Sequence, residues 1–334
     1  MAVSAPFARV PLPRIEAFIP TYESALAIND LITAVLLFGQ FVRIRSLGLL
    51  ILASGYLFDA LIIISHALTF PGVLSPQGLL QAGPQTTAWL YCFLHGGFAV
   101  FVVFYALSGH FGGGPVFRNF RFALSIGILG TAALVFALTL LAISAQQMLT
   151  PIMVGNDYSL VVTKGISPTI CIFSVIALAL LWPRLKTSTL DLWLFVVMCV
   201  RICDVILSAV IGSSRFDLGW YGGRSFGLLA ASFLLVILLL ELLKLYDNLA
   251  ERTAQLQLNE SRLRSILETS HLYQGLLAVD GSVLHANATA LKGIQVNLTD
   301  VPGARFGRRH GLAKQTAYRS LCVRPFRRLP GVIQ

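Results

Sequence analysis

The sequence predicts an all-α polytopic membrane protein with about seven transmembrane helices, followed by a cytoplasmic helix and a partial α+β segment. Three observations predict this class: the composition, seven long apolar stretches, and a leucine repeat after the last of them. Of the 334 residues, 56% are hydrophobic and 12% are charged, and the mean hydropathy is +0.77. Soluble globular chains carry about 25% charged residues, so the composition excludes a cytosolic or secreted enzyme.

Seven stretches have the length of membrane spans, because a hydrocarbon layer about 30 Å thick requires about 20 apolar residues per helix. Each is expected to be a helix, since an open sheet cannot satisfy its backbone in lipid. The expected spans are residues 26–43, 47–70, 87–107, 122–143, 166–182, 190–212 and 224–243. The first is the weakest, because Asn29 and Asp30 lie near its start. We assign residues 1–25 to an N-terminal tail, without a signal peptide because prolines interrupt it, and residues 26–246 to the membrane domain.

The loops predict an orientation, because short cytoplasmic loops are enriched in Lys and Arg. One set of loops carries six basic residues and the opposite set carries three. The six are Arg43, Arg45, Arg118, Arg121, Arg184 and Lys186, and the three are Lys164, Arg215 and Arg224. We therefore expect a multi-pass protein whose C-terminal region is cytoplasmic.

Three ionisable residues fall at similar depth inside the predicted spans. Each costs roughly 2.5–3.5 kcal/mol near the bilayer centre on insertion scales, so each needs a partner or a function. Asp59 in the second span lies within about one helical turn of the depth of Arg201 and Asp204 in the sixth. We expect an intramembrane polar cluster of these three residues, acting either as a buried ion pair that fixes helix register or as a ligand or proton site.

His66 and His95 form a second candidate site, in the outer halves of the second and third spans. Facing histidines can ligate a haem or a metal, or titrate as a pH switch. The alternative is that each ring hydrogen-bonds to a neighbouring helix. Cys199 and Cys203 share a helix face without a completing ligand, so we expect no metal site. We also expect no cofactor, with haem kept as an alternative.

An aromatic and charged segment precedes the seventh span. Its notable residues are Arg215, Asp217, Trp220, Tyr221 and Arg224. Aromatic residues commonly anchor helices at the membrane interface, and this combination beside glycines can also line an outward-facing cleft. On the opposite side, Gly112–Gly114 is expected to form a flexible cytoplasmic turn, because no Lys-Ser or Lys-Thr follows it.

After the last span, leucines recur every seven residues at Leu242, Leu249, Leu256 and Leu263. This spacing predicts a heptad helix over residues 242–269. We expect it to form a parallel homodimer, with an amphipathic helix lying on its own domain as the alternative. Residues 270–300 then read as a small α+β unit: a strand at 276–279, a turn at Asp280-Gly281, a strand at 282–285, and a helix that follows.

Two parts of the chain are similar to known families. Gly55-Tyr56-Leu57-Phe58-Asp59-Ala60, the segment from His66 to Gly72, Trp89, His95-Gly96-Gly97-Phe98 and the residues from Arg215 through Tyr246 resemble a membrane-associated sensor (MASE) domain of its fourth class. The two strands around Asp280-Gly281 and the following Ala286-Asn287-Ala288 resemble the start of a PAS domain, in which an Asn caps the next helix.

These resemblances imply a bacterial inner-membrane sensory module of the kind found in sensor histidine kinases and diguanylate cyclases. A stimulus would pass from the spans through a signalling helix to the PAS domain. The expected partners are membrane lipids, a second copy of the chain and an unknown stimulus, with no catalytic activity. A small transporter or a haem-bearing electron carrier is the alternative from another class.

The C-terminal tail departs from this pattern. Residues 301–334 contain eight basic residues and no acid, which leaves the first 300 residues with a net charge of +2 out of the total of +10. One nucleotide added after the Phe306 codon can restore a PAS-like peptide, so we expect the tail to be disordered or out of frame and the output domain to be absent. Its charge is therefore not taken as a nucleic-acid-binding signal.

Overall fold

The structure is a computed structural model that describes residues 5–76, 78–79, 82–83, 85–109, 119–144, 149–186, 188–212, 214–277, 279 and 283–294. The chain divides into two compact units, Met1–Leu242 and Leu243–Gln334. Several predicted features lie outside the described residues: the Gly112–Gly114 turn, the Asp280-Gly281 turn, residues 295–300 and the tail 301–334.

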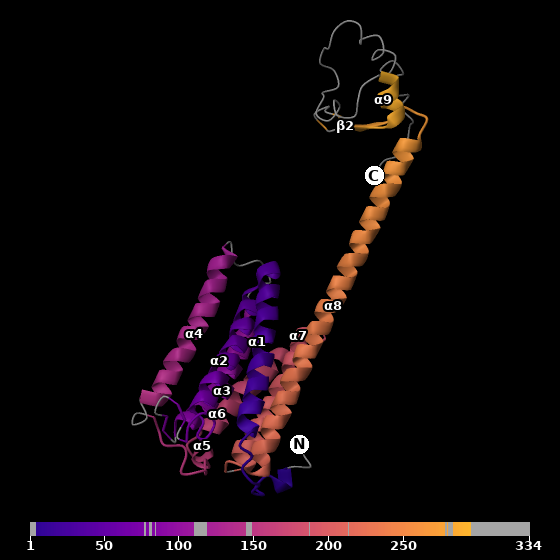
Figure 1. Cartoon of the computed structure of the whole chain (residues 1–334). Helices are drawn as coiled ribbons and strands as arrows, with labels where there is room; N and C mark the ends of the chain where they lie inside the picture. Colours follow the sequence, from indigo (N-terminus) through magenta and orange to yellow (C-terminus); the bar gives the residue numbers. More distant parts are fainter. Residues whose placement is uncertain are drawn as a thin grey trace. The chain divides into compact units, whose positions relative to one another are not determined.

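The first unit is a helical bundle (Figure 1). Its long helices are α1 (Phe18–Ile44), α2 (Leu47–Thr69), α3 (Thr86–Ser108), α4 (Phe120–Ser144), α6 (Ile166–Leu181), α7 (Thr189–Val205) and the first part of α8 (Leu218–Thr269). Short helical turns are η1 (Ala5–Phe7), α5 (Leu160–Thr163), η3 (Trp182–Arg184) and η4 (Ile206–Ile211). Among the described residues, seven helices are long and apolar enough to cross a membrane, which confirms the predicted fold class.

The first helix begins at Phe18, eight residues before the expected start of the first span. Proline is tolerated in the first turn of a helix, where its missing N–H leaves no bond unmade, so Pro20 does not prevent this start. The segment before α1 is also ordered against the start of α8: the Leu12 amide donates to the Phe216 carbonyl and the Leu218 amide donates to the Val10 carbonyl, each at 2.9 Å. Part of the predicted N-terminal tail is therefore ordered, and its last residues belong to α1.

Within the bundle, α2 packs against α1, α3 and α4, and α6 packs between α3 and α7. Figure 1 shows α4 at one side of the bundle. The core contains an edge-on ring pair of Tyr56 and Phe98, with centroids 5.0 Å apart. A close approach of α2 and α3 occurs at Gly97, where a Cβ would lie 2.5 Å from the Phe58 ring. Small residues allow such contacts between membrane helices.

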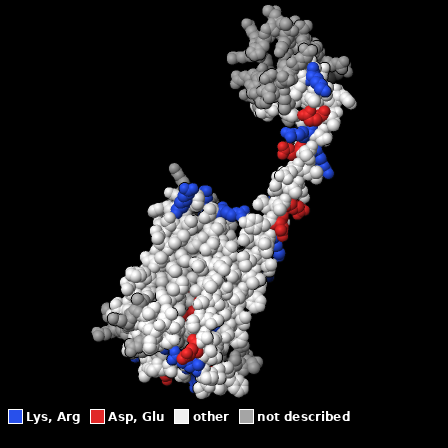
Figure 2. All heavy atoms as spheres, viewed as in Figure 1, with Lys and Arg blue, Asp and Glu red and all other residues white. Residues whose placement is uncertain are grey.

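Charged side chains gather at the ends of the bundle rather than along its visible side. Figure 2 shows Lys and Arg at the end where α4 begins, and few charged residues over the middle of this face. Large apolar side chains of α4 are exposed instead, among them Phe122 and Leu129 at 65% and 68%. This distribution suits a surface that faces lipid.

The second unit contains the last part of α8, the antiparallel strands β1 (Gly275–Leu277) and β2 (Val283–Ala286), and α9 (Ala288–Ile294). Asn287 is fully buried and organises it. Its Oδ1 accepts from the amides of Gln274 and Ala290, and its Nδ2 donates to the carbonyls of Leu267 and Leu272. The bond from Ala290 makes Asn287 the N-cap of α9.

Candidate functional site

Ionisable side chains from five helices meet inside the first unit. They are Glu23 and Asp30 on α1, Asp59 and His66 on α2, His95 on α3, Arg201 and Asp204 on α7, and Arg224 on α8. All but Arg201 are less than one-tenth exposed, and the Arg201 side chain is 14% exposed. Burial of this many ionisable groups is costly in lipid, so their pairing decides how the helices fit together.

Arg201 and Asp59 form a hydrogen-bonded ion pair between α7 and α2. The guanidinium also lies over the Phe98 ring, 4.1 Å from its centroid. The second and sixth spans therefore meet at the depth of these two residues. The predicted polar cluster requires such a contact between the two spans. Asp204 pairs elsewhere: its Oδ2 lies 3.6 Å from His95 Nε2 on α3.

The two histidines are each partnered by a carboxylate of another helix. His66 Nδ1 lies 2.7 Å from Glu23 Oε1, and His95 faces Asp204. Both rings line one small cavity, but no hydrogen bond joins them among the described residues. The haem alternative stays a prediction, and a Soret band in purified membranes would reveal it.

Three small cavities follow this network through the bundle. We call them the loop cavity, the middle cavity and the deep cavity. Their volumes are about 40, 20 and 30 Å³, respectively. His66, Tyr91 and Arg224 line both the loop and middle cavities, and His95 lines both the middle and deep cavities. A cavity needs a volume of about 10–15 Å³ to hold one water molecule. Each of the three cavities therefore has room only for water or a small ligand.

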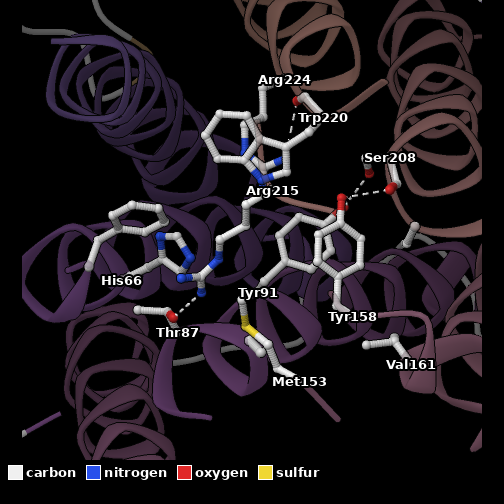
Figure 3. Close-up of a pocket in the computed structure, with 13 residues that line it drawn as sticks. His66, Thr87, Tyr91, Met153, Tyr158, Val161, Ser208, Arg215, Trp220 and Arg224 are labelled. Carbon is white, nitrogen blue, oxygen red and sulfur yellow. Dashed lines mark hydrogen bonds between the residues drawn. The ribbon is translucent and has the colours of Figure 1, made fainter. Parts of the chain in front are cut away.

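The loop cavity lies between α2, α3, η4, the start of α8 and two loops (Figure 3). Arg215 extends into it and donates to Thr87 Oγ1 at 2.5 Å. Arg224 stands over the Trp220 ring at 4.2 Å and the Tyr91 ring at 5.1 Å. Burial, followed by the nearby charge of Arg224, lowers the pKa of Arg215 to about 10.

A π-helical turn, η4, shapes one wall of the loop cavity. The wider turn presents Ser208, whose carbonyl accepts from Tyr158 Oη at 2.8 Å and whose hydroxyl lies 3.0 Å from Tyr91 Oη. Burial raises the pKa of Tyr158, so this loop tyrosine stays a neutral donor. Single π turns inside α-helices occur frequently at functional sites.

Comparison with protein families decides the identity of this bundle. The family model described as a membrane-associated sensor, integral membrane domain (MASE4) matches residues 13–246. The chain belongs to the MASE4 family. A search of curated proteins and a search of solved structures found no match.

The MASE4 match covers every long helix of the bundle and the first part of α8. It begins at residue 13, five residues before α1, so Val10 and Leu12, which bond the segment around the start of α8, lie just outside it. The strands and α9 of the second unit lie outside the match.

The five residues predicted to line an outer cleft of the MASE4 domain separate into two groups. Arg215, Trp220 and Arg224 line the loop cavity. Asp217 instead caps α8, because its Oδ1 accepts from the Trp220 amide at 2.7 Å. The Tyr221 hydroxyl bonds the N-terminal segment, accepting from the Ile15 amide and donating to the Pro13 carbonyl.

The sequence did not lead us to predict Glu23 and Asp30 as site residues. The predicted first span began after Glu23, and Asp30 was considered only as a residue that weakens this span. Their spacing of seven residues on a helix was the available signal, since it places both carboxylates on one face. Sequence reasoning also missed the buried Asp191 at the basic end of the bundle, where the partly exposed Arg184 places Nε 2.9 Å from Asp191 Oδ2 and Tyr105 Oη donates to Asp191 at 2.5 Å.

Proposed function

We propose that the MASE4 domain is the sensory input module of a bacterial signal-transduction protein, of the two-component or cyclic-di-nucleotide type, and that α8 carries its signal out of the membrane. One observation carries the proposal. The same helix supplies Arg224 to the buried polar network and continues without interruption through the heptad leucines to Thr269.

Helix geometry supports α8 as the output element. A helix of 52 residues is about 78 Å long at 1.5 Å per residue, far more than a bilayer requires. Buried charges must keep a partner when they move, so a stimulus that changes the partners of Asp204 or Arg224 favours a different position of α8. Such a shift is transmitted along a continuous helix.

Downstream of the membrane, we propose that α8 forms a parallel dimer through the seam Leu242, Leu249, Leu256 and Leu263. Three of these side chains, Leu249, Leu256 and Leu263, are 54–70% exposed in the single chain, which leaves an apolar stripe to be covered. We also propose that the unit after α8 is the start of a PAS domain. The strand pair and the capping role of Asn287 support this assignment.

We further propose an inner-membrane location with the C-terminal region in the cytoplasm. Support comes from the end of the bundle that carries Arg43, Arg45, Arg121, Arg184 and Lys186, because basic residues accumulate on the cytoplasmic side.

Hydrogen exchange of residues 243–269 tests the proposed function. The full chain in lipid nanodiscs is compared with Asp204→Asn, which perturbs the network next to α8, and with Asp191→Asn. Asp191 is the matched control because it is also a buried acid of α7, but it bonds Tyr105 and Arg184.

We expect Asp204→Asn to change amide exchange in residues 243–269 by about fivefold, equivalent to roughly 1 kcal/mol of local stability. Asp191→Asn should leave these amides unchanged. Equal exchange in all three proteins would contradict α8 as the output of the MASE4 domain.

A further inference from the structure

The loop cavity has an excess of positive charge. Arg215 and Arg224 both line it, and none of its lining residues is Asp or Glu. Within the described part of the chain, neither guanidinium forms an ion pair with a carboxylate. Arg215 bonds the Thr87 hydroxyl, and Arg224 bonds the Trp220 carbonyl at 3.2 Å. Two cations thus face one cavity with only neutral acceptors.

The aromatic walls hold the two guanidinium planes in place. Arg224 lies over Trp220 and Tyr91, and Arg215 lies 4.9 Å from the centroid of Phe70. Rings that cover the faces of a guanidinium leave its N–H edges available for hydrogen bonds. Those edges match the paired oxygens of a planar oxyanion.

Asp204, outside the cavity lining, attracts Arg224, but no carboxylate within the lining offsets the repulsion between Arg224 and Arg215. The charge of Arg224, acting in addition to burial, lowers the pKa of Arg215 to about 10. Repulsion between two cations is strong where water is scarce. A bound anion would convert this repulsion into two charge-assisted interactions.

The size of the cavity limits the ligand. A volume of about 40 Å³ corresponds to roughly three or four water-sized atoms. We propose that the loop cavity binds a small trigonal oxyanion, such as a short carboxylate or a nitrate-like ion, between Arg215 and Arg224. This inference rests on the proposed function and names the ligand class of the sensor, since Arg224 lies on the output helix α8.

Thermal unfolding of the full chain in a neutral detergent tests the proposal. Sodium gluconate keeps the ionic strength constant while sodium acetate or sodium nitrate replaces it. Gluconate carries the same carboxylate as acetate but is too large for the cavity. We expect acetate or nitrate to raise the unfolding midpoint in a saturable way. If acetate acts at a lower concentration than nitrate, the preferred ligand is an organic carboxylate. If nitrate acts at the lower concentration, the preferred ligand is an inorganic oxyanion.

The variant Arg215→Gln should raise the half-saturating concentration at least about tenfold, because it loses a hydrogen bond to a charged ligand. Lys164→Gln is the matched control: Lys164 is an exposed cation in the loop sequence between α4 and α6, outside the cavity. The Lys164→Gln variant should have the same half-saturating concentration as the unmodified chain. If Arg215→Gln does not fold, Arg215→Lys replaces it, since it keeps the charge but loses the planar fork.

Equal responses to acetate and gluconate would overturn the site, as would equal half-saturation in Arg215→Gln and Lys164→Gln. Binding measured in this way does not depend on signalling. Saturable binding with no effect on hydrogen exchange in residues 243–269 would therefore count against the proposed function and leave the anion site standing.

Discussion

Asp204 on α7 lies directly against Gly223 on α8, so closely that a Cβ at position 223 would overlap its Oδ1 atom. The other carboxylate oxygen faces His95 on α3. Arg224, the next residue on α8, is close enough for electrostatic attraction to Asp204. One carboxylate on α7 therefore contacts both α3 and α8, and α8 is the helix proposed to carry the signal.

Gly223→Ala should destabilise the bundle by about 1–3 kcal/mol, because overpacking forces the Asp204 side chain and its backbone to move. Gly222→Ala is the control from the same helix turn, where the nearest atom, Leu207 Cδ2, would be in ordinary contact at 3.5 Å. Gly222→Ala should cost nothing, since alanine suits a helix better than glycine. The midpoints of thermal unfolding in detergent compare the two. Equal midpoints would contradict the close contact.

Asp59→Asn should lower stability by about 3–5 kcal/mol, because it removes the carboxylate that is hydrogen-bonded to the Arg201 guanidinium inside the bundle. The double variant Asp59→Leu with Arg201→Met should recover most of the loss, since it removes both charges. Denaturant titrations of the three proteins measure these differences. If the single variant is as stable as the unmodified chain, the pair does not hold α2 to α7.

The sequence predicted the seven spans well, because lipid requires a local property, about 20 consecutive apolar residues. The start of α1 was predicted wrongly for the same reason. Prolines interrupt the N-terminal segment and made it read as a tail, while Glu23 within it is partnered by His66, 43 positions away. Hydropathy cannot detect a partner at that distance.

Depth along a span predicted the meeting of Asp59 and Arg201, because both helices cross the same layer. Depth does not determine rotation about the helix axis, so the pairing of Asp204 with His95 could not be predicted. The same limit applies to the loop cavity. Arg215, Thr87 and Tyr158 come from segments far apart in the sequence, and a π-helical turn without a sequence signature shapes its wall.

Asn287→Ala should loosen the second unit. It removes the N-cap of α9, which typically contributes about 0.5–2 kcal/mol, together with the bonds to Leu267 and Leu272. Hydrogen exchange of residues 275–290 should accelerate by about tenfold. Asn259→Ala, an exposed asparagine on α8, is the control and should leave exchange unchanged. Unchanged exchange in Asn287→Ala would show that this side chain does not organise the unit.

Leu256→Lys should dissociate the proposed dimer, because it places a charge in the middle of the heptad seam. Leu258→Lys is the matched control, an exposed leucine two residues away and off the seam. Light scattering of the full chain in detergent measures the mass of each complex. The mass should halve only in Leu256→Lys, and a dimer that survives this change would exclude the seam.

The most direct test of the link between the buried network and α8 is amide hydrogen exchange of residues 243–269 in Gly223→Ala and Gly222→Ala, in lipid nanodiscs. If Asp204 sets the position of α8, exchange in these residues should change in Gly223→Ala by about fivefold and stay unchanged in Gly222→Ala. Identical exchange in the two variants, with Gly223→Ala less stable within the membrane, would show that the bundle does not signal through α8.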